Sequence, residues 1–444
     1  MSFDNTLKPF VPTATRPFDE RAGAHLLRRA GFGGSRDEIL ELIKEGPAAA
    51  AERLVNAPPD SALVELDETL DTALSGNDIE NLRAWWLLRM VRTAAPFREK
   101  LALFLHGHFA TAQRKVQSLR AMHAQIKLFL NKGSGSFRST AKDVARDAAM
   151  LIYLDGIKSE KGKPNENFAR ELMELFILGR GQYSELDIRE AARAFTGWRV
   201  DGGRARRFTP AFDAGVKTIF NKTGAFGPGE VVDLCIEHPA SAPFLAKKIL
   251  RFFVCPEPPE EIVNAVAREL REQDFAIGSV MIKIFQSDFF YSDAAYRVNV
   301  KSPVEFTVGT LRILGGRIGG HALARAVAEM GQNLLDPPSV KGWDGHKSWI
   351  HAATWLARVQ FVFSATQQGG PLARDFEVKK LFDNNSHQDG DVGAALSLLL
   401  QNDAPAEVRE ELLNHYNVKK ERNGDAARRD LLRVILTMPE FHCA

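Results

Sequence analysis

The chain has 444 residues, of which 45% are hydrophobic and 26% charged, a balance typical of water-soluble globular proteins. Its 58 basic and 56 acidic side chains nearly cancel, which argues against a protein dedicated to nucleic acid. Three scattered cysteines exclude a CxxC zinc knuckle, a thioredoxin-type motif and a fold that depends on disulfides. No stretch is long enough for a membrane span, and residues 1–10 do not resemble a signal peptide. The sequence thus predicts a cytoplasmic protein, or one exported only with a partner.

Helical signals dominate the first half of the chain. Residues 1–17 are rich in Pro and Thr and are expected to lie extended on the surface. A capping box of Ser35 and Glu38 starts one helix, and Ser184 with Asp187 caps another. Thr140 and Asp143 are expected to open a helix that runs to residue 154. The other helices predicted from apolar periodicity cover 19–29, 78–91, 97–109, 119–130 and 165–178.

The amino-acid composition no longer follows a helical pattern between residues 198 and 226. An Asp201-Gly202 pair between Arg-rich flanks predicts a β-hairpin, and strands are expected nowhere else. Helices are then predicted at 242–254, 260–273, 277–286, 304–314, 322–330 and 351–366, with three more at the end. The predicted fold is mainly α, a large multi-helical globule with one small β-hairpin region near 198–226. Residues 18–444 are expected to form one domain, with a possible sub-boundary near 198–228 between halves 18–197 and 229–444.

The helix over 165–178 carries the first candidate site. Asn167, Arg170, Glu171 and Glu174 share one of its faces, so the two carboxylates can act as a catalytic pair. The competing interpretation is a solvated face, in which Arg170 pairs with its neighbouring glutamates at helical spacing.

The second candidate is His106-Gly107-His108. In a regular helix the two imidazoles point roughly 200° apart and cannot share a metal. Gly107 weakens the helix, and in a kinked segment both rings can turn inward, where carboxylates from another helix would complete an iron, manganese or zinc site. The alternative is one hydrogen-bonded core histidine and one exposed histidine.

A loop from 336 to 349, rich in Pro and Trp, is the third candidate. Trp343 and Trp349 lie beside His346 and can form a platform for a ligand such as a sugar ring. The alternative is a loop pinned by buried tryptophans. Nearby, Lys301 and Glu305 are expected to form a structural pair at a helix start. The sequence contains no GxSxG, HExxH or P-loop motif.

Motifs along nearly the whole chain resemble the bacterial family of unknown function catalogued as domain-of-unknown-function 1800. The matching segments are LLRRAGFG (26–33), FLHGHF (104–109), PNENFARELMELF (164–176), FTGW (195–198), DAGVKT (213–218), KSPVEF (301–306) and Gly331-Gln332 through Gly342-Trp343. Two positions depart from the family pattern, in which a histidine usually precedes Asp213 and a tryptophan usually precedes His106. Here these positions hold Phe212 and Leu105, and Phe212 removes one possible metal ligand.

The resemblance implies a large helical protein, with no settled activity to carry over. It also implies a partner protein, because genes of this family often neighbour a second family that resembles sulfatases or phosphatases and bears export signals. Within the shared motifs, Lys217 joins Trp343, His346 and Trp349 as a ligand-binding candidate.

Two hypotheses follow. In the first, the protein is a metal-dependent enzyme, hydrolytic or oxidative, in which His106 and His108 bind a divalent metal beside Glu171, Glu174, Arg170 and Asn167. In the second, it is a non-enzymatic scaffold or a ligand- or glycan-binding subunit of a complex.

Overall fold

The computed structural model describes residues 6–73, 78–315, 318–372, 375–382, 389–421 and 423–444. Helices make up most of it, as predicted. The helices of the first half are α1 Glu20–Ala30, α2 Arg36–Asn56, α3 Val64–Ala73, α4 Ile79–Arg92, α5 Pro96–His108, α6 Gln113–Val116, α7 Leu119–Lys132, α8 Phe137–Val144, α9 Ala148–Tyr153, α10 Asn167–Glu171 with a π-helical continuation over Leu172–Ile177, and α11 Glu185–Ala194.

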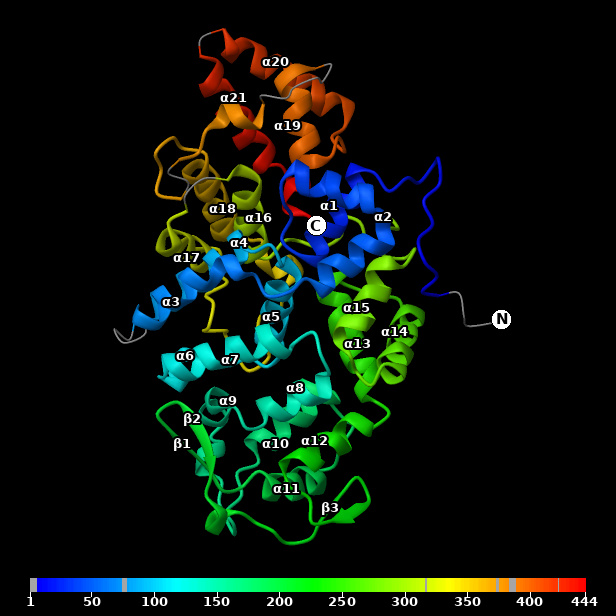
Figure 1. Ribbon diagram of the computed structural model, residues 1–444, viewed down its shortest axis with the longest axis vertical. Helices are drawn as coiled ribbons and strands as arrows, with labels where there is room; N and C mark the ends of the chain where they lie inside the picture. Colours follow the sequence, from blue (N-terminus) through cyan, green and yellow to red (C-terminus); the bar gives the residue numbers. More distant parts are fainter. Residues whose placement is uncertain (1–5, 74–77, 316–317, 373–374, 383–388, 422) are drawn as a thin grey trace.

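The second half is helical too. Its helices are α12 Pro228–Glu237, α13 Ser241–Phe253, α14 Glu260–Glu272, α15 Ile277–Gln286, α16 Pro303–Leu314, α17 Gly320–Glu329, α18 Ala352–Ala365, α19 Gly390–Leu400, α20 Ala406–Lys420 and α21 Gly424–Leu436. Figure 1 shows an elongated molecule with α19–α21 at one end, the β-strands at the other, and α5, α13 and α16 between them. No helix among the described residues is both long enough and apolar enough to cross a bilayer.

The strands lie where the sequence predicted them. Strand β1 (Trp198–Asp201) pairs with β2 (Arg204–Arg207) through a turn in which Gly202 and Gly203 have φ of 55° and 77°. A second hairpin, which was not predicted separately, pairs β3 (Lys217–Ile219) with β4 (Lys222–Gly224). Both turns need two positive φ angles, the geometry that matches the twist of paired strands.

Side-chain caps fix several helix starts. The boxes of Ser35 with Glu38 and of Ser184 with Asp187 both form. The prediction of one helix from Thr140 to residue 154 is wrong, because two helices stand there. Ser136 caps the first and the Asp147 carboxylate caps the second, so Thr140 lies inside α8.

Segments far apart in sequence share one interior. The buried apolar residues form a single cluster from Phe10 to Phe441. Buried Arg29 of α1 donates to the carbonyls of Phe252 and Phe253 at 2.7 and 2.9 Å. Arg312 of α16 donates to Val91 O in the last turn of α4 and to Thr93 O just after it, at 3.1 and 3.0 Å. Such bonds satisfy carbonyls that would otherwise be buried without donors, and they fix how α1, α4, α13 and α16 meet.

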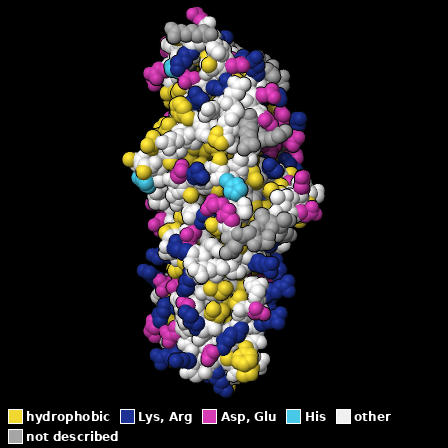
Figure 2. Space-filling view, turned by 90° about the vertical axis from the view of Figure 1, so that its left-hand side faces the viewer, with side chains coloured by type: hydrophobic (Ala, Val, Ile, Leu, Met, Phe, Trp, Pro, Cys, Tyr) yellow, Lys and Arg dark blue, Asp and Glu magenta, His cyan; other side chains and the backbone are white. Residues whose placement is uncertain are grey.

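The surface carries both signs of charge. Figure 2 shows acidic and basic side chains interspersed over one face, with Lys and Arg more frequent toward the end that carries the strands. This agrees with the near-zero net charge of the sequence.

Candidate functional site

His106 and His108 lie on opposite faces of α5, because a helix turns about 200° over two residues. His106 is fully buried between Trp86 and Trp343, whose ring centroids lie 5.4 and 5.6 Å from its own. Its Nε2 accepts the amide N–H of Leu335 at 3.2 Å. Burial lowers the pKa of His106 to about 4, so the ring is neutral at physiological pH and packs as a core residue.

His108 faces the π-helical segment instead. Its Nε2 lies 2.9 Å from the carbonyl oxygen of Phe176 and donates to it. Burial first, and the Lys248 ammonium second, hold the pKa of His108 well below its usual range. The predicted encounter between the HxH segment and the helix over 165–178 therefore occurs, but through a backbone carbonyl.

The carboxylates of that helix have other partners. Arg170 bonds both oxygens of Glu185 at 2.9 and 2.8 Å, and also reaches Glu166. Glu174 accepts from Arg180 at 2.6 Å and from Tyr183 at 2.8 Å. None of these residues lines a site with the histidines.

Two further members of the predicted catalytic set lie near the same surface. Asn167 donates to Leu154 O at 3.4 Å, and Glu171 is half-buried. Burial first, and neighbouring Glu174 second, raise the pKa of Glu171. Among the described residues, no three His, Cys, Asp or Glu side chains gather closely enough to hold a metal ion.

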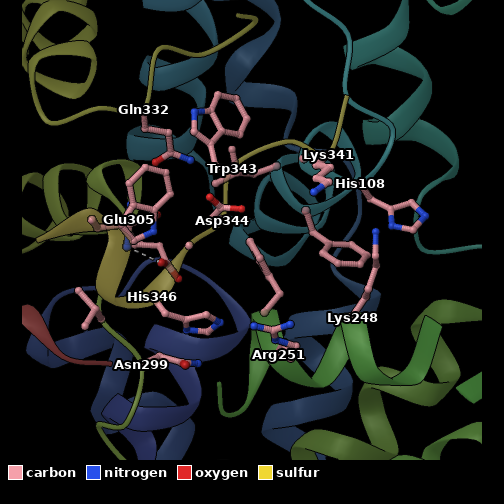
Figure 3. A pocket seen from close by; sticks show the side chains of 18 of the residues that line it. His108, Lys248, Arg251, Asn299, Glu305, Gln332, Lys341, Trp343, Asp344 and His346 are labelled. Atoms are coloured by element: carbon pink, nitrogen blue, oxygen red, sulfur yellow. Dashed lines mark hydrogen bonds between the residues drawn. The ribbon is translucent and has the colours of Figure 1, made fainter. Parts of the chain in front are cut away.

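The structure builds a different pocket, of about 290 Å³, beside α5 (Figure 3). Gly107 and His108 line it from α5, and Lys248 and Arg251 from α13. The rest of the lining comes from α1, from the start of α16 and the segment that leads into it, from Gln332 after α17, and from the segment 336–349, the tryptophan loop. These remaining residues include Arg29, Asn299, Ser302, Glu305, Gln332, Lys341, Trp343, Asp344, His346 and Trp349.

Gly342 lets the tryptophan loop lie against the backbone of α5 at Gly107. A Cβ on Gly342 would meet Gly107 O at 2.3 Å, and the φ of Gly342 is +79°. At Gly107 itself a Cβ would meet nothing within 4 Å. Gly107, which the sequence marked as a weak point of the helix, thus leaves open space in the pocket lining.

The far end of the loop is anchored as well. Trp349 is buried, and its carbonyl oxygen accepts the Thr354 hydroxyl at 3.0 Å. Trp343 remains half-buried and His346 lies in the pocket wall, where burial first and Arg251 second lower its pKa. Three of the four predicted ligand-binding residues, Trp343, His346 and Trp349, therefore lie in one pocket.

The fourth, Lys217, lies elsewhere. It is buried in β3, and its ammonium donates to the carbonyls of Asp213 and Gly215, each at 2.8 Å. These bonds fix the loop before the second hairpin.

Glu305 is held in the pocket by buried cations. Its carboxylate lies 2.8 Å from Lys100 Nζ and 4.0 Å from Arg29 Nη1. Burial alone would raise its pKa, but Lys100 and Arg29 outweigh burial and lower the pKa to about 2. The sequence paired Glu305 with Lys301, but the Lys301 ammonium donates to Phe441 O at 2.6 Å.

Sequence reasoning missed the basic side of the pocket. Lys248 and Arg251 are three residues apart on α13, the spacing of one helix face, but nothing local indicates that this face meets α5. Gln332 and Glu305 stood within recognised motifs, yet only the fold brings them to the tryptophan loop.

Comparison with known proteins gives one match. A family model described as "Protein of unknown function (DUF1800)" matches residues 25–443, a range that includes every pocket residue. Comparison with curated proteins found no match, and neither did comparison with solved structures.

Proposed function

Because the chain belongs to the DUF1800 family of proteins of unknown function, we propose its role from its own pocket: it binds a small polar molecule there. Its volume of about 290 Å³ lies near the lower end for small-molecule sites, which run from about 300 to 1,000 Å³. An occupant of monosaccharide size would fit such a space.

One observation carries the proposal. Asn299 is only 4% exposed and lines the pocket, and its Oδ1 is buried with no hydrogen-bond partner. Its Nδ2 donates to Val254 O at 3.2 Å, which fixes the amide. Buried polar atoms in proteins are nearly always bonded, so an unpaired acceptor on a residue that lines the pocket favours a ligand group or water that donates to it.

The walls suit a ring-shaped occupant. Trp343 and Trp349 offer apolar faces, and Gln332 adds a polar contact. Gln332 Oε1 accepts the amide N–H of Val304 at 3.0 Å, which turns its NH₂ group toward other partners. Large apolar surfaces with a few fixed polar groups are the usual composition of a small-molecule site.

Filling the pocket tests this proposal. Gly107→Leu adds a side chain where a Cβ would meet nothing within 4 Å, and Gly424→Leu does the same at the start of α21, away from the pocket. Thermal unfolding would be followed against neutral sugars, sugar acids, sugar phosphates and amino acids. We expect at least one compound to raise the Tm of the wild type and of Gly424→Leu but not of Gly107→Leu. If no compound does so, or if Gly107→Leu responds equally, the proposal fails.

A metal-dependent enzyme is the second candidate. It rests on the motifs shared with the family. Each of His106 and His108 has a buried Nδ1 atom without a hydrogen-bond partner, but the two rings lie on opposite faces of α5 and cannot share one ion. Elemental analysis of the untagged protein, compared with His106→Ala and Glu171→Ala, tests it. Near-stoichiometric iron, manganese or zinc lost from both variants would support a metal centre; wild-type protein that holds no metal even after metal is added back would reject it.

The sulfatase-like partner is likewise a proposal. It is supported only by the family resemblance, and co-purification from the native host would test it.

A further inference from the structure

We propose that the occupant of this pocket is a hydroxylated molecule with an acidic group, a sugar acid or a sugar phosphate, and that Lys248, Arg251 and Lys341 hold the acidic group. This inference rests on the proposed function, since it names the class of ligand for the same site.

Three basic residues of the pocket, unlike Arg29, form no ion pair with a carboxylate among the described residues. Arg251 and Lys341 are exposed and have no ion pair with any residue that the structure describes. Lys248 donates only to a carbonyl, Leu175 O, at 2.8 Å. Such groups can still form charge-assisted bonds with a carboxylate or phosphate, which are about twice as strong as neutral hydrogen bonds.

The carboxylates of the pocket do not cancel this charge. Glu305 is already paired with Lys100 and Arg29, so these two buried cations compensate its negative charge. Asp344 is exposed and is the other carboxylate in the lining. Lys248, Arg251 and Lys341 therefore leave an excess of basic groups in front of α13. Burial first, and Arg251 second, lower the pKa of Lys248 to about 8, so its ammonium is still mostly charged at neutral pH.

The two kinds of contact lie on different sides. In Figure 3, Lys341, Lys248 and Arg251 lie toward one side of the pocket, and Glu305, Gln332 and Asn299 toward the other. The second group offers carboxylate and amide atoms, which accept from and donate to hydroxyl groups. A molecule with an acidic group at one end and hydroxyls at the other matches both sides at once.

Adjacent lysines of α13 supply a matched pair of variants. Lys248 lines the pocket, whereas Lys247 is exposed and forms an ion pair with Glu260 at 3.2 Å. Calorimetric titration would compare glucuronate, glucose 6-phosphate, glucose and inorganic phosphate as probes. We expect glucuronate or glucose 6-phosphate to bind at least about 10-fold more tightly than glucose. Lys248→Gln should remove most of this preference, and Lys247→Gln should change affinity less than about two-fold.

The outcomes separate the two proposals. If glucose stabilises the wild type but not Gly107→Leu, and acidic probes bind no better, the pocket binds ligands but this inference is wrong. Equal affinities in Lys248→Gln and Lys247→Gln would also overturn it, as would inorganic phosphate binding as tightly as glucose 6-phosphate. If Lys248→Gln fails to fold, exposed Arg251→Gln takes its place with the same expected loss. If no probe of any kind binds, both proposals fail.

Discussion

At the scale of single residues, the site depends on a contact between two glycines. Gly342 places its backbone against the carbonyl of Gly107, and its φ of +79° is one that only glycine adopts readily. Gly345, three residues later, has nearly the same φ, +78°, but a Cβ there would meet nothing within 4 Å. The two positions therefore separate backbone strain from a steric clash.

Gly342→Ala should destabilise the protein more than Gly345→Ala. The positive φ alone costs about 1–2 kcal/mol at either position. At position 342 the added methyl must also displace the Gly107 carbonyl, which should cost about 1–3 kcal/mol more. Chemical denaturation of both variants measures the difference; equal losses would show that the loop does not press on α5.

His106 should make the protein sensitive to acid. Its pKa is about 4 in the folded protein and 6.5 in the unfolded chain, so the unfolded state binds the proton first as the pH falls. The contribution of His106 to the free energy of unfolding should be fully present above about pH 6.5. It should decrease by about 3 kcal/mol by pH 4.

The replacement His106→Gln keeps an acceptor for the Leu335 amide and removes the titration. Other buried histidines, such as His25 and His442, contribute their own acid sensitivity in both proteins, so the comparison isolates position 106. Unfolding free energies measured from pH 7 to 4 should fall less steeply in the variant. An unchanged slope would mean that His106 is not held neutral in the core.

At the same scale, the sequence grouped residues correctly when they are close in the chain, but not when their contacts depend on the fold. Trp343, His346 and Trp349 stand close together in the chain, and the loop brings them to one pocket. Lys217 and the carboxylates Glu171 and Glu174 were grouped with distant residues by chemical type alone. Their actual partners, such as Arg180 for Glu174, depend on how the loop after the helix turns back.

At the scale of elements, α1, α5 and α16 meet around a buried charge cluster. Lys100 of α5 is fully buried, and its Nζ lies 2.8 Å from Oε1 of Glu305 in α16; Arg29 Nη1 of α1 lies 4.0 Å from the same oxygen. Glu305 also accepts the amide N–H of Ser302 at 2.9 Å and so completes the capping box of its own helix. One carboxylate thus orients three helices and forms part of the pocket wall.

Glu305→Gln should be strongly destabilising, because it leaves two buried cations without a counter-charge. Breaking one partner of a buried pair costs about 3–5 kcal/mol. Ser302→Ala, which removes only the side-chain cap, should cost about 1 kcal/mol. In a double-mutant cycle, Lys100→Met combined with Glu305→Gln should lose less than the sum of the two single losses. Additive losses would contradict a direct interaction between the two side chains.

The sequence predicted the first residue of a helix correctly in several places where a side-chain cap marks it. The predicted caps at Ser35 and Ser184 are confirmed, because their side-chain oxygens accept from amides one turn ahead; Asp19 caps α1 in the same way, although that helix was predicted from apolar spacing alone. The break between α8 and α9 was missed, because Asp147 looks like an ordinary exposed helix residue in sequence. The π-helical turn was missed as well, since an extra residue in a turn leaves no pattern in apolar spacing.

At the scale of the whole molecule, the pocket collects residues from Arg29 to Trp349. The sequence predicted the helical class and the place of the strands from periodicity and turn residues. It could not predict the pocket, because α5, α13 and the tryptophan loop meet only through contacts more than a hundred residues apart, such as Leu335 with His106. Long-range packing of this kind is set by complementary surfaces and not by local propensity.

The two predicted halves should not fold separately. Buried His25 reaches Phe290 O at 2.9 Å, and Arg29 reaches Phe253 O, so the interior of each half includes groups from the other. Fragments 18–197 and 229–444 expressed alone should lack cooperative thermal unfolding, and the full chain should show a single transition. A fragment with a sharp transition of its own would establish a domain boundary near 198–228.

The position of two pocket side chains depends on the number of residues in the π-helical turn over Leu172–Ile177. Two successive carbonyls of this turn, Leu175 O and Phe176 O, accept from the pocket residues Lys248 and His108 at 2.8 and 2.9 Å. Deleting one residue from the turn would restore ordinary α-helical winding and rotate the following carbonyls by about 100°. Most substitutions in this segment leave the backbone oxygens in place, whereas a one-residue deletion moves them. The pocket is therefore more sensitive to the number of residues in this turn than to their identity, although none of them lines it.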